Sequence, residues 1–255
     1  MFFWILVFFI LGSAVGSFLN VVIDRATHGE SILGRSYCDH CRKTLAPLDL
    51  VPIVSFLALS AKCRHCKGQI SWQYPLVETA TGVLFAFSFL RLTQLGQLGI
   101  ITLAYYFFLV SVIIIVAVID IKFSLIPTTL VFLASLISLF YNYFFLSSPL
   151  FVEHVLAAFG AAVFFAAIVL ITRGKGMGEG DIVISFLIGM VLGQRGTIVA
   201  IFLGFFTGAL ISLLLIVLNK KHFGQTIPFA PFLALGFLIA FFWANEIINW
   251  YLMIY

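Results

Sequence analysis

Residues 98–119 read LGIITLAYYFFLVSVIIIVAVI, an uninterrupted stretch without a charged side chain that ends directly at Asp120. About 20 mostly apolar residues are needed for an α-helix to cross the hydrocarbon core of a membrane. This stretch therefore predicts a transmembrane helix, and it places a carboxylate at the boundary between that helix and the next loop.

Apolar segments of similar character recur along the chain and predict an all-α, polytopic membrane protein. They span residues 2–23, 75–90, 98–119, 126–146, 151–171, 181–192, 197–218 and 229–251. The sixth segment falls below the usual spanning length of about 17 residues, so a re-entrant segment is its alternative. We expect eight membrane spans.

The composition excludes most other classes of protein. Hydrophobic residues make up 63% of the chain and charged residues only 9%, whereas soluble domains average about 45–50% and about 25%. A formal net charge of +4 gives no basis for nucleic-acid binding. The first residues lack the basic region and cleavage site of a signal peptide, so we expect a retained first helix.

The basic residues predict the orientation of the spans, because Lys and Arg favour cytoplasmic loops. With eight spans, only Arg91 and Arg195 fall on one side. The other side holds Arg25, Arg35, Arg42, Lys43, Lys62, Arg64, Lys67, Lys122, Arg173, Lys175, Lys220 and Lys221. Both termini are then outside. We expect a first helix at 1–23, a cytoplasmic loop domain at 24–74 and a seven-helix membrane domain at 75–255.

The predicted cytoplasmic loop holds all four cysteines of the chain. Cys38 and Cys41 form one C-x-x-C pair, and Cys63 and Cys66 form a second. Two such pairs at this separation are the ligand set of a tetrahedral structural zinc site. Disulfides are disfavoured in a reducing cytoplasm. A thioredoxin-like redox pair, or four thiols without a metal, are the alternatives.

Two carboxylates lie at the predicted cytoplasmic boundary of the membrane. Asp120 ends the third span and Asp181 opens the sixth, after a Gly-rich stretch. Ionisable groups beside hydrocarbon are functional candidates, and two carboxylates in a poorly solvated place share a proton and divide acid and base roles. They would then activate water against a peptide carbonyl. The alternative is two unrelated carboxylates at helix ends, and Glu179 is a less favoured partner.

Two further features lie outside these motifs. One is predicted to be structural, and the position of the other is left open. Gly12 and Gly16 are spaced as a small-residue face for packing against another helix. Glu78 lies either at the interface or inside the helix bundle.

The chain also resembles the type IV prepilin peptidases, membrane aspartic proteases that often act as N-methyltransferases as well. The motifs occur in the family's order over nearly the whole chain. They are Gly16-Ser17-Phe18-Leu19-Asn20-Val21, Gly34-Arg35-Ser36 before the cysteine pairs, Leu50-Val51-Pro52, Tyr74-Pro75-Leu76-Val77-Glu78, Asp120 with Ile126-Pro127, Gly178-Glu179-Gly180-Asp181, Ile227-Pro228-Phe229 and Pro231-Phe232-Leu233-Ala234-Leu235-Gly236.

The resemblance implies a bacterial inner-membrane endopeptidase that removes the cytoplasmic leader from prepilin or pseudopilin substrates. Asp120 and Asp181 would be its catalytic pair at the cytoplasmic face. It also implies S-adenosylmethionine as the methyl donor, if methyl transfer is retained. The alternatives are a peptidase without methyl transfer, a proton-coupled transporter with a structural zinc site, and an interaction scaffold in which Asn can replace both aspartates.

Overall fold

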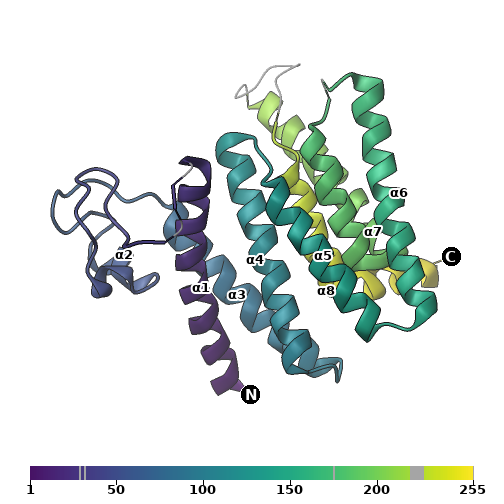
Figure 1. Cartoon of the computed structure of the whole chain (residues 1–255), viewed down its shortest axis with the longest axis horizontal. Helices are drawn as coiled ribbons and strands as arrows, with labels where there is room; N and C mark the ends of the chain where they lie inside the picture. The colour runs from purple at the N-terminus through teal and green to yellow at the C-terminus, as the bar shows by residue number, and fades with distance from the viewer. Residues whose placement is uncertain (29, 32, 175, 219–226, 255) are drawn as a thin grey trace. The chain divides into compact units, whose positions relative to one another are not determined.

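The computed structural model describes residues 1–28, 30–31, 33–174, 176–218 and 227–254. In these residues the helices are α1 (Phe2–His28), the short 3₁₀ helix η1 (Pro47–Leu50), α2 (Val54–Ala58), α3 (Gln73–Gln94), α4 (Ile100–Phe123), α5 (Thr128–Phe145), α6 (Ser148–Thr172), α7 (Glu179–Val217) and α8 (Ala230–Ile254). The chain divides into two compact units, residues 1–115 and 116–255 (Figure 1). The boundary falls within α4.

The predicted fold class is confirmed. Seven helices in the described part of the chain are long and apolar enough to cross a membrane, and β-structure there is limited to two isolated bridges. Many large apolar side chains on these helices are exposed, for example Phe132, Phe144 and Phe202. That arrangement suits lipid and would be costly in water.

The difference between seven helices and the eight predicted spans lies in α7, which contains both the sixth and the seventh predicted segments. Gly193 interrupts α7 with φ 65° and ψ −174°, a backbone conformation that is essentially restricted to glycine. Figure 1 shows the two ends of α7 on the same side of its unit, so the chain reverses at this residue. The sixth predicted segment is the helix before this break and the seventh is the helix after it, so α7 consists of two helices that meet at Gly193.

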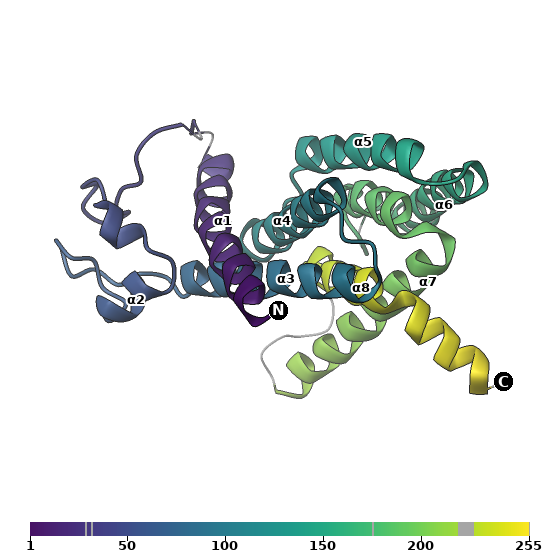
Figure 2. The same cartoon turned by 90° about the horizontal axis from the view of Figure 1, so that it is seen from below.

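In the first unit, α1 and α3 pack through glycines, as the spacing of Gly12 and Gly16 predicts (Figure 2). A Cβ atom on Gly12 would lie 2.7 Å from the carbonyl oxygen of Thr81, and one on Gly16 would lie 2.8 Å from the Cα of Glu78. Gly82 makes the reciprocal approach from α3. These residues bring the two backbones close enough for dense packing.

In the second unit, α6 and α8 each pack closely on a different part of α7. Gly189, in the first part, touches the backbone of Ala157 and Ala158 on α6. Gly236 on α8 touches the backbone of Ala200, in the second part. Phe164 and Phe165 of α6 also contact Phe205 in the second part of α7, so α6 packs on both parts.

The break at Gly193 interrupts the helical hydrogen bonding of the preceding turn. Neighbouring side chains form hydrogen bonds to one carbonyl group of that turn. Asn142 Nδ2 donates to the carbonyl oxygen of Met190 at 2.6 Å, and His154 Nδ1 lies 2.9 Å from the same oxygen. Because lipid offers no hydrogen-bond donor, such side chains stabilise a broken helix.

Some sequence predictions are not tested by the structure. The division at residues 23 and 74 stays a prediction, although α1 continues to His28 and α3 begins at Gln73. The predicted cytoplasmic residues Lys175, Lys220 and Lys221 lie outside the described residues.

We predict that Gly193→Ala destabilises the protein. The added Cβ would lie 2.8 Å from His154 Nε2, and a residue forced into this backbone conformation costs of order 1–3 kcal/mol. Thermal unfolding in detergent measures the effect. Gly160→Ala is the matched control, because nothing lies within 4 Å of its Cβ position and alanine in a helix is about 1 kcal/mol better than glycine. Equal melting temperatures for the two variants would contradict the prediction.

Candidate functional site

The second unit brings the two predicted aspartates together. Asp120 lies three residues before the end of α4, and Asp181 is the third residue of α7. Both are buried, with exposed fractions of 6% and 5%, and their carboxylates are close enough to interact electrostatically. Two helix ends that are distant in sequence thus form one buried acidic pair.

Asp120 is held by the first residue of α8. The backbone N–H of Ala230 donates to Asp120 Oδ2 at 3.1 Å, and both groups are buried. Residues 227–229 are not helical, as expected for a segment that contains Pro228, so the N–H of Ala230 is not used inside a helix. The sequence analysis did not anticipate this contact, because it joins residues 110 positions apart.

Asp181 is held at the beginning of its own helix. The backbone N–H of Gly178 donates to Asp181 Oδ2 at 3.1 Å, which is a capping interaction. Gly180 is required for space, since a Cβ there would lie 2.8 Å from the Cβ of Ile126 in the α4–α5 connection. Gly180 before Asp181 therefore allows the first turn of α7 to approach this connection closely.

The other candidate carboxylates lie elsewhere. Glu179, the less favoured partner, is exposed at the first position of α7. Glu78 belongs to the first unit, where it is 7% exposed and its Oε2 accepts the backbone N–H of Ile53 at 2.7 Å. The choice left open for Glu78 is thus decided in favour of an interior position.

The four cysteines converge in the loop between α1 and α3. Their Sγ atoms all lie within 4.8 Å of one another, and those of Cys38 and Cys66 are 3.9 Å apart. A tetrahedral site with Zn–S bonds of about 2.3 Å places its sulfurs about 3.8 Å apart. The four sulfurs therefore fit a zinc ion, and all four cysteines are free thiols.

The two C-x-x-C turns have the same backbone geometry. The N–H of Arg42 donates to the carbonyl of Cys38, and that of Lys67 donates to the carbonyl of Cys63. Arg42 and Lys67, which follow the second cysteine of each pair, both have left-handed backbones, with φ 57° and 59°. The repeated sequence pattern thus becomes a repeated structure that presents two sulfurs from each turn.

The backbone also favours the thiolate form at one of these cysteines. The backbone N–H groups of Cys66 and His65 donate to the sulfur of Cys63 and lower the pKa of that thiol to about 6. Metal ions bind thiolates rather than thiols, so the lowered pKa of Cys63 favours its use as a metal ligand. A zinc ion here would hold the loop together and, with four protein ligands, would have no open position for catalysis.

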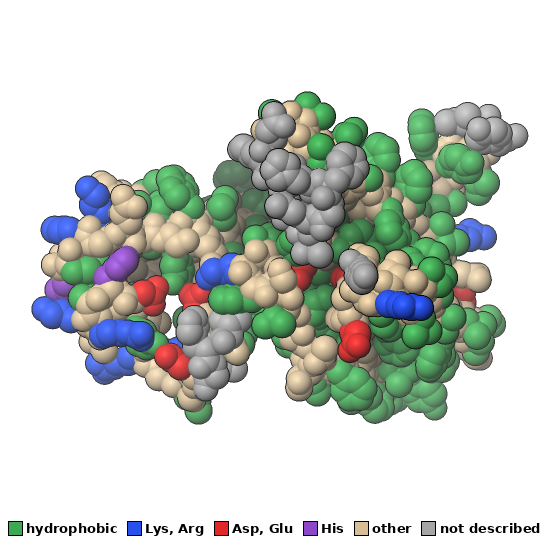
Figure 3. All heavy atoms as spheres, turned by 90° about the horizontal axis from the view of Figure 1, so that it is seen from above, with side chains coloured by type: hydrophobic (Ala, Val, Ile, Leu, Met, Phe, Trp, Pro, Cys, Tyr) green, Lys and Arg blue, Asp and Glu red, His purple; other side chains and the backbone are tan. Residues whose placement is uncertain are grey.

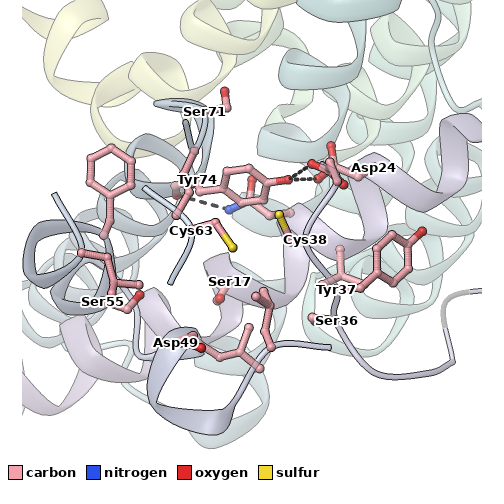
Figure 4. A pocket seen from close by; sticks show the side chains of 18 of the residues that line it. Ser17, Asp24, Ser36, Tyr37, Cys38, Asp49, Ser55, Cys63, Ser71 and Tyr74 are labelled. Atoms are coloured by element: carbon pink, nitrogen blue, oxygen red, sulfur yellow. Dashed lines mark hydrogen bonds between the residues drawn. The ribbon is translucent and has the colours of Figure 1, made fainter. Parts of the chain in front are cut away.

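A cavity of about 430 Å³ lies beside the cysteines, entirely within the first unit (Figure 4). Its walls come from α1, the cysteine loop and the start of α3, and include Asp24, Cys38, Cys63, Tyr74 and Glu78. Figure 3 shows Lys, Arg and His side chains gathered on the outer surface of this loop. The cavity was not predicted, since its lining residues are widely spaced in sequence.

These features define a class, the helical membrane proteins with a buried pair of aspartates and a four-cysteine loop. Two family models match the chain: the bacterial peptidase A24 N-terminal domain over residues 10–92 and the type IV leader peptidase family over residues 107–213.

Curated relatives extend the match over nearly the full length. A prepilin leader peptidase/N-methyltransferase of Bacillus subtilis is 36% identical over 96% of this chain and 97% of the relative. Proteins of the same name from Legionella pneumophila and Pseudomonas aeruginosa are 31% and 30% identical over 94% and 95% of this chain, and over 91% of each relative. No solved structure matches. The chain belongs to the type IV leader peptidase family.

We predict that the purified protein holds one zinc ion, which metal analysis by mass spectrometry measures. Changing Cys38 and Cys63 to Ser removes one sulfur from each turn and should abolish metal binding, while helical circular dichroism persists because the spans satisfy their own backbones. His65→Gln is the control that keeps all four sulfurs. Protein prepared without chelators that contains no zinc would contradict the assignment.

Proposed function

We propose that this chain is a membrane aspartic endopeptidase that removes the leader from type IV prepilin-like substrates and methylates the new N-terminus. The observation that carries the proposal is the buried pair Asp120 and Asp181 at two helix ends of one unit. The family membership and the names of the relatives give the same reaction class.

The proposed chemistry divides acid and base roles between the two aspartates. One carboxylate takes a proton from a water molecule as the water oxygen attacks the peptide carbonyl carbon. The other, protonated, gives its proton to the leaving nitrogen when the C–N bond breaks. The backbone N–H of Ala230 bonds one oxygen of Asp120 and orients the carboxylate, and proton transfer is assigned to its other oxygen.

The position of the pair suits a substrate that is partly in the membrane. Prepilin-like substrates, as the resemblance implies, carry a short polar leader that ends in Gly next to an apolar helix. Asp120 and Asp181 lie at the ends of apolar helices rather than in their middle, where such a junction would lie. A proton-coupled transporter would instead place its carboxylates near mid-membrane.

The two ligands implied by the family have different proposed roles. Zinc would bind Cys38, Cys41, Cys63 and Cys66 and stabilise the loop between α1 and α3. S-adenosylmethionine would supply the methyl group from its sulfonium centre. No metal is assigned to peptide hydrolysis, since the aspartates perform both proton transfers.

We further propose a bacterial inner-membrane location with both termini outside and the aspartates at the cytoplasmic face. The distribution of Lys and Arg supports this orientation. The partners are then the bilayer and the prepilin or pseudopilin chains within it.

Asp120→Asn and Asp181→Asn should each reduce cleavage of a synthetic prepilin by at least about 100-fold, because Asn is nearly isosteric but can neither accept nor release the proton that water activation requires. The double variant should be hardly worse than either single variant, since the residues act as a unit. Mass analysis of the product's new N-terminus measures cleavage. Wild-type activity should vary with pH through two apparent pKa values that belong to the pair.

Glu179→Gln is the matched control and should keep most activity, because Glu179 is exposed and has no assigned proton transfer. Wild-type turnover in either Asn variant would reject the aspartic-protease assignment and favour a transporter or a scaffold. Rapid inhibition by chelators would instead point to a metalloprotease.

Reporter fusions test the orientation. Fusions after Lys67, Arg173 and Lys221 should report the cytoplasm, and fusions after Gln94 and Arg195 should report the outside. A cytoplasmic signal at Arg195 would mean that the first part of α7 re-enters the membrane instead of crossing it.

A further inference from the structure

The loop between α1 and α3 contains an apolar segment that its own packing does not bury. Residues 50–61 read LVPIVSFLALSA and carry no charged side chain. Within this segment, Val54 and Leu57 of α2 are 61% and 68% exposed, and Trp72, directly before α3, is 67% exposed. Large apolar side chains that gather on the surface of a small loop domain mark an interaction surface.

Two contacts hold α2 against the start of α3. The backbone N–H of Ile53, the residue directly before α2, donates to Glu78 Oε2 at 2.7 Å. The buried ring of Phe56 packs edge-on against Trp72, with their ring centroids 5.0 Å apart. All four residues belong to the first unit. The exposed apolar side chains of α2 are therefore fixed to a helix that is long and apolar enough to cross the membrane.

The contact with Glu78 also fixes the depth of α2. The 22 residues of α3 span about 33 Å at 1.5 Å per residue, close to the hydrocarbon thickness of about 30 Å. Its first residue, Gln73, thus lies at the edge of the hydrocarbon, and Glu78 lies about 7–8 Å further along the helix. Figure 1 shows α2 beside α1 rather than beyond the C-terminal end of α1. We conclude that α2 lies at the level of the first turns of α3.

The rest of the loop is basic. Residues 33–72 include two acidic and six basic side chains. The six basic ones are all exposed: Arg35, Arg42, Lys43, Lys62, Arg64 and Lys67. Of the acidic ones, Asp49 pairs with Arg64 at 2.7 Å. Figure 3 shows Lys and Arg side chains along the outer edge of the loop. An excess of four positive charges beside a membrane span is typical of segments that bind anionic lipid.

A lipid leaflet is the occupant that matches both properties of this surface. Segments that lie in the membrane interface combine apolar side chains with Lys and Arg beside them, and Trp is enriched at the level of the headgroups. Since α2 is joined to α3, the leaflet is adjacent to it without any further partner. A basic peptide would be repelled by the positive charge of the loop.

We propose that the four-cysteine loop docks on the bilayer through residues 50–61 and Trp72, and that its basic side chains bind anionic lipid headgroups. Val54 and Leu57 enter the boundary between headgroups and acyl chains, and Lys43 and Lys62 lie at the level of the phosphates. This docking is independent of peptide hydrolysis. It holds the loop and its cavity at the membrane surface.

A single-tryptophan reporter tests the depth of α2. The full-length chain carries Leu57→Trp in a background in which Trp4, Trp72, Trp243 and Trp250 are changed to Phe, and it is placed in lipid nanodiscs. Lipids brominated on the acyl chains quench an indole that touches them, and iodide quenches an indole in water. Leu57→Trp should be quenched by lipid, most strongly by bromine near the headgroup, and little by iodide.

Phe202→Trp in the same background is the matched control. Phe202 is 65% exposed and lies within the second part of α7, well away from the ends of that span. Its indole should be quenched most strongly by bromine deep in the acyl chains. The two reporters thus have similar exposure and differ in the depth at which they meet lipid.

The same reporter measures the headgroup preference. In nanodiscs that mix phosphatidylglycerol with phosphatidylcholine, bromine is carried first by one lipid and then by the other. Leu57→Trp should prefer the anionic lipid by at least about fivefold, the contribution expected from one Lys near an anionic surface. Adding Lys43→Gln/Lys62→Gln should lower the preference to about twofold or less. Lys122→Gln/Arg173→Gln is the matched control, because it removes the same charge from the second unit and should keep the preference.

Hydrogen exchange on the chain with its natural tryptophans gives a second measurement. The amides of residues 54–61 should exchange more slowly in phosphatidylglycerol nanodiscs than in phosphatidylcholine nanodiscs. Lys43→Gln/Lys62→Gln should abolish this difference.

Three results would overturn the proposal, and none of them depends on cleavage activity. Quenching of Leu57→Trp by iodide and not by lipid would mean that α2 faces water. Quenching by neither would mean that protein covers α2, either the second unit or a second copy of the chain. Equal quenching by the two brominated lipids, with equal hydrogen exchange, would reject the binding of anionic headgroups.

Discussion

The constraint on which this structure depends is that the membrane interior supplies no hydrogen-bond partners for the backbone. Helices satisfy their own N–H and C=O groups except at their ends and breaks. Three buried carboxylates among the described residues accept such an N–H group: Asp120 from Ala230, Asp181 from Gly178 and Glu78 from Ile53. The same need explains the bonds that Asn142 and His154 make to the carbonyl of Met190 at the break in α7.

These contacts link helix geometry to chemistry. A carboxylate that accepts a backbone N–H has a fixed orientation, and a fixed orientation is what proton transfer to a bound substrate requires. Two glycines allow the backbone contacts and the chain reversal that complete this arrangement. Gly180 lets the first turn of α7 reach Ile126, and Gly193 returns the chain so that α8 packs on the second part of α7. The acidic pair is thus positioned by backbone contacts more than by side-chain packing.

The two units have complementary chemical characters. Residues 116–255 hold the aspartate pair, with apolar surroundings suited to a peptide bond at the membrane edge. Residues 1–115 hold the four sulfurs and the cavity beside them. The two family models divide the chain in a similar way, at residues 10–92 and 107–213.

The sequence by itself determined the all-α membrane class and the approximate spans, and it singled out the four cysteines and the two aspartates that the structure brings together, because hydropathy and residue spacing are local properties of the chain. It also anticipated the packing role of Gly12 and Gly16. Only the tertiary structure decided that Gly193 breaks the helix between two predicted spans, that Ala230 bonds Asp120, and that Glu78 faces a cavity. These depend on contacts between residues far apart in sequence, and no local pattern encodes which distant N–H group will reach a given carboxylate.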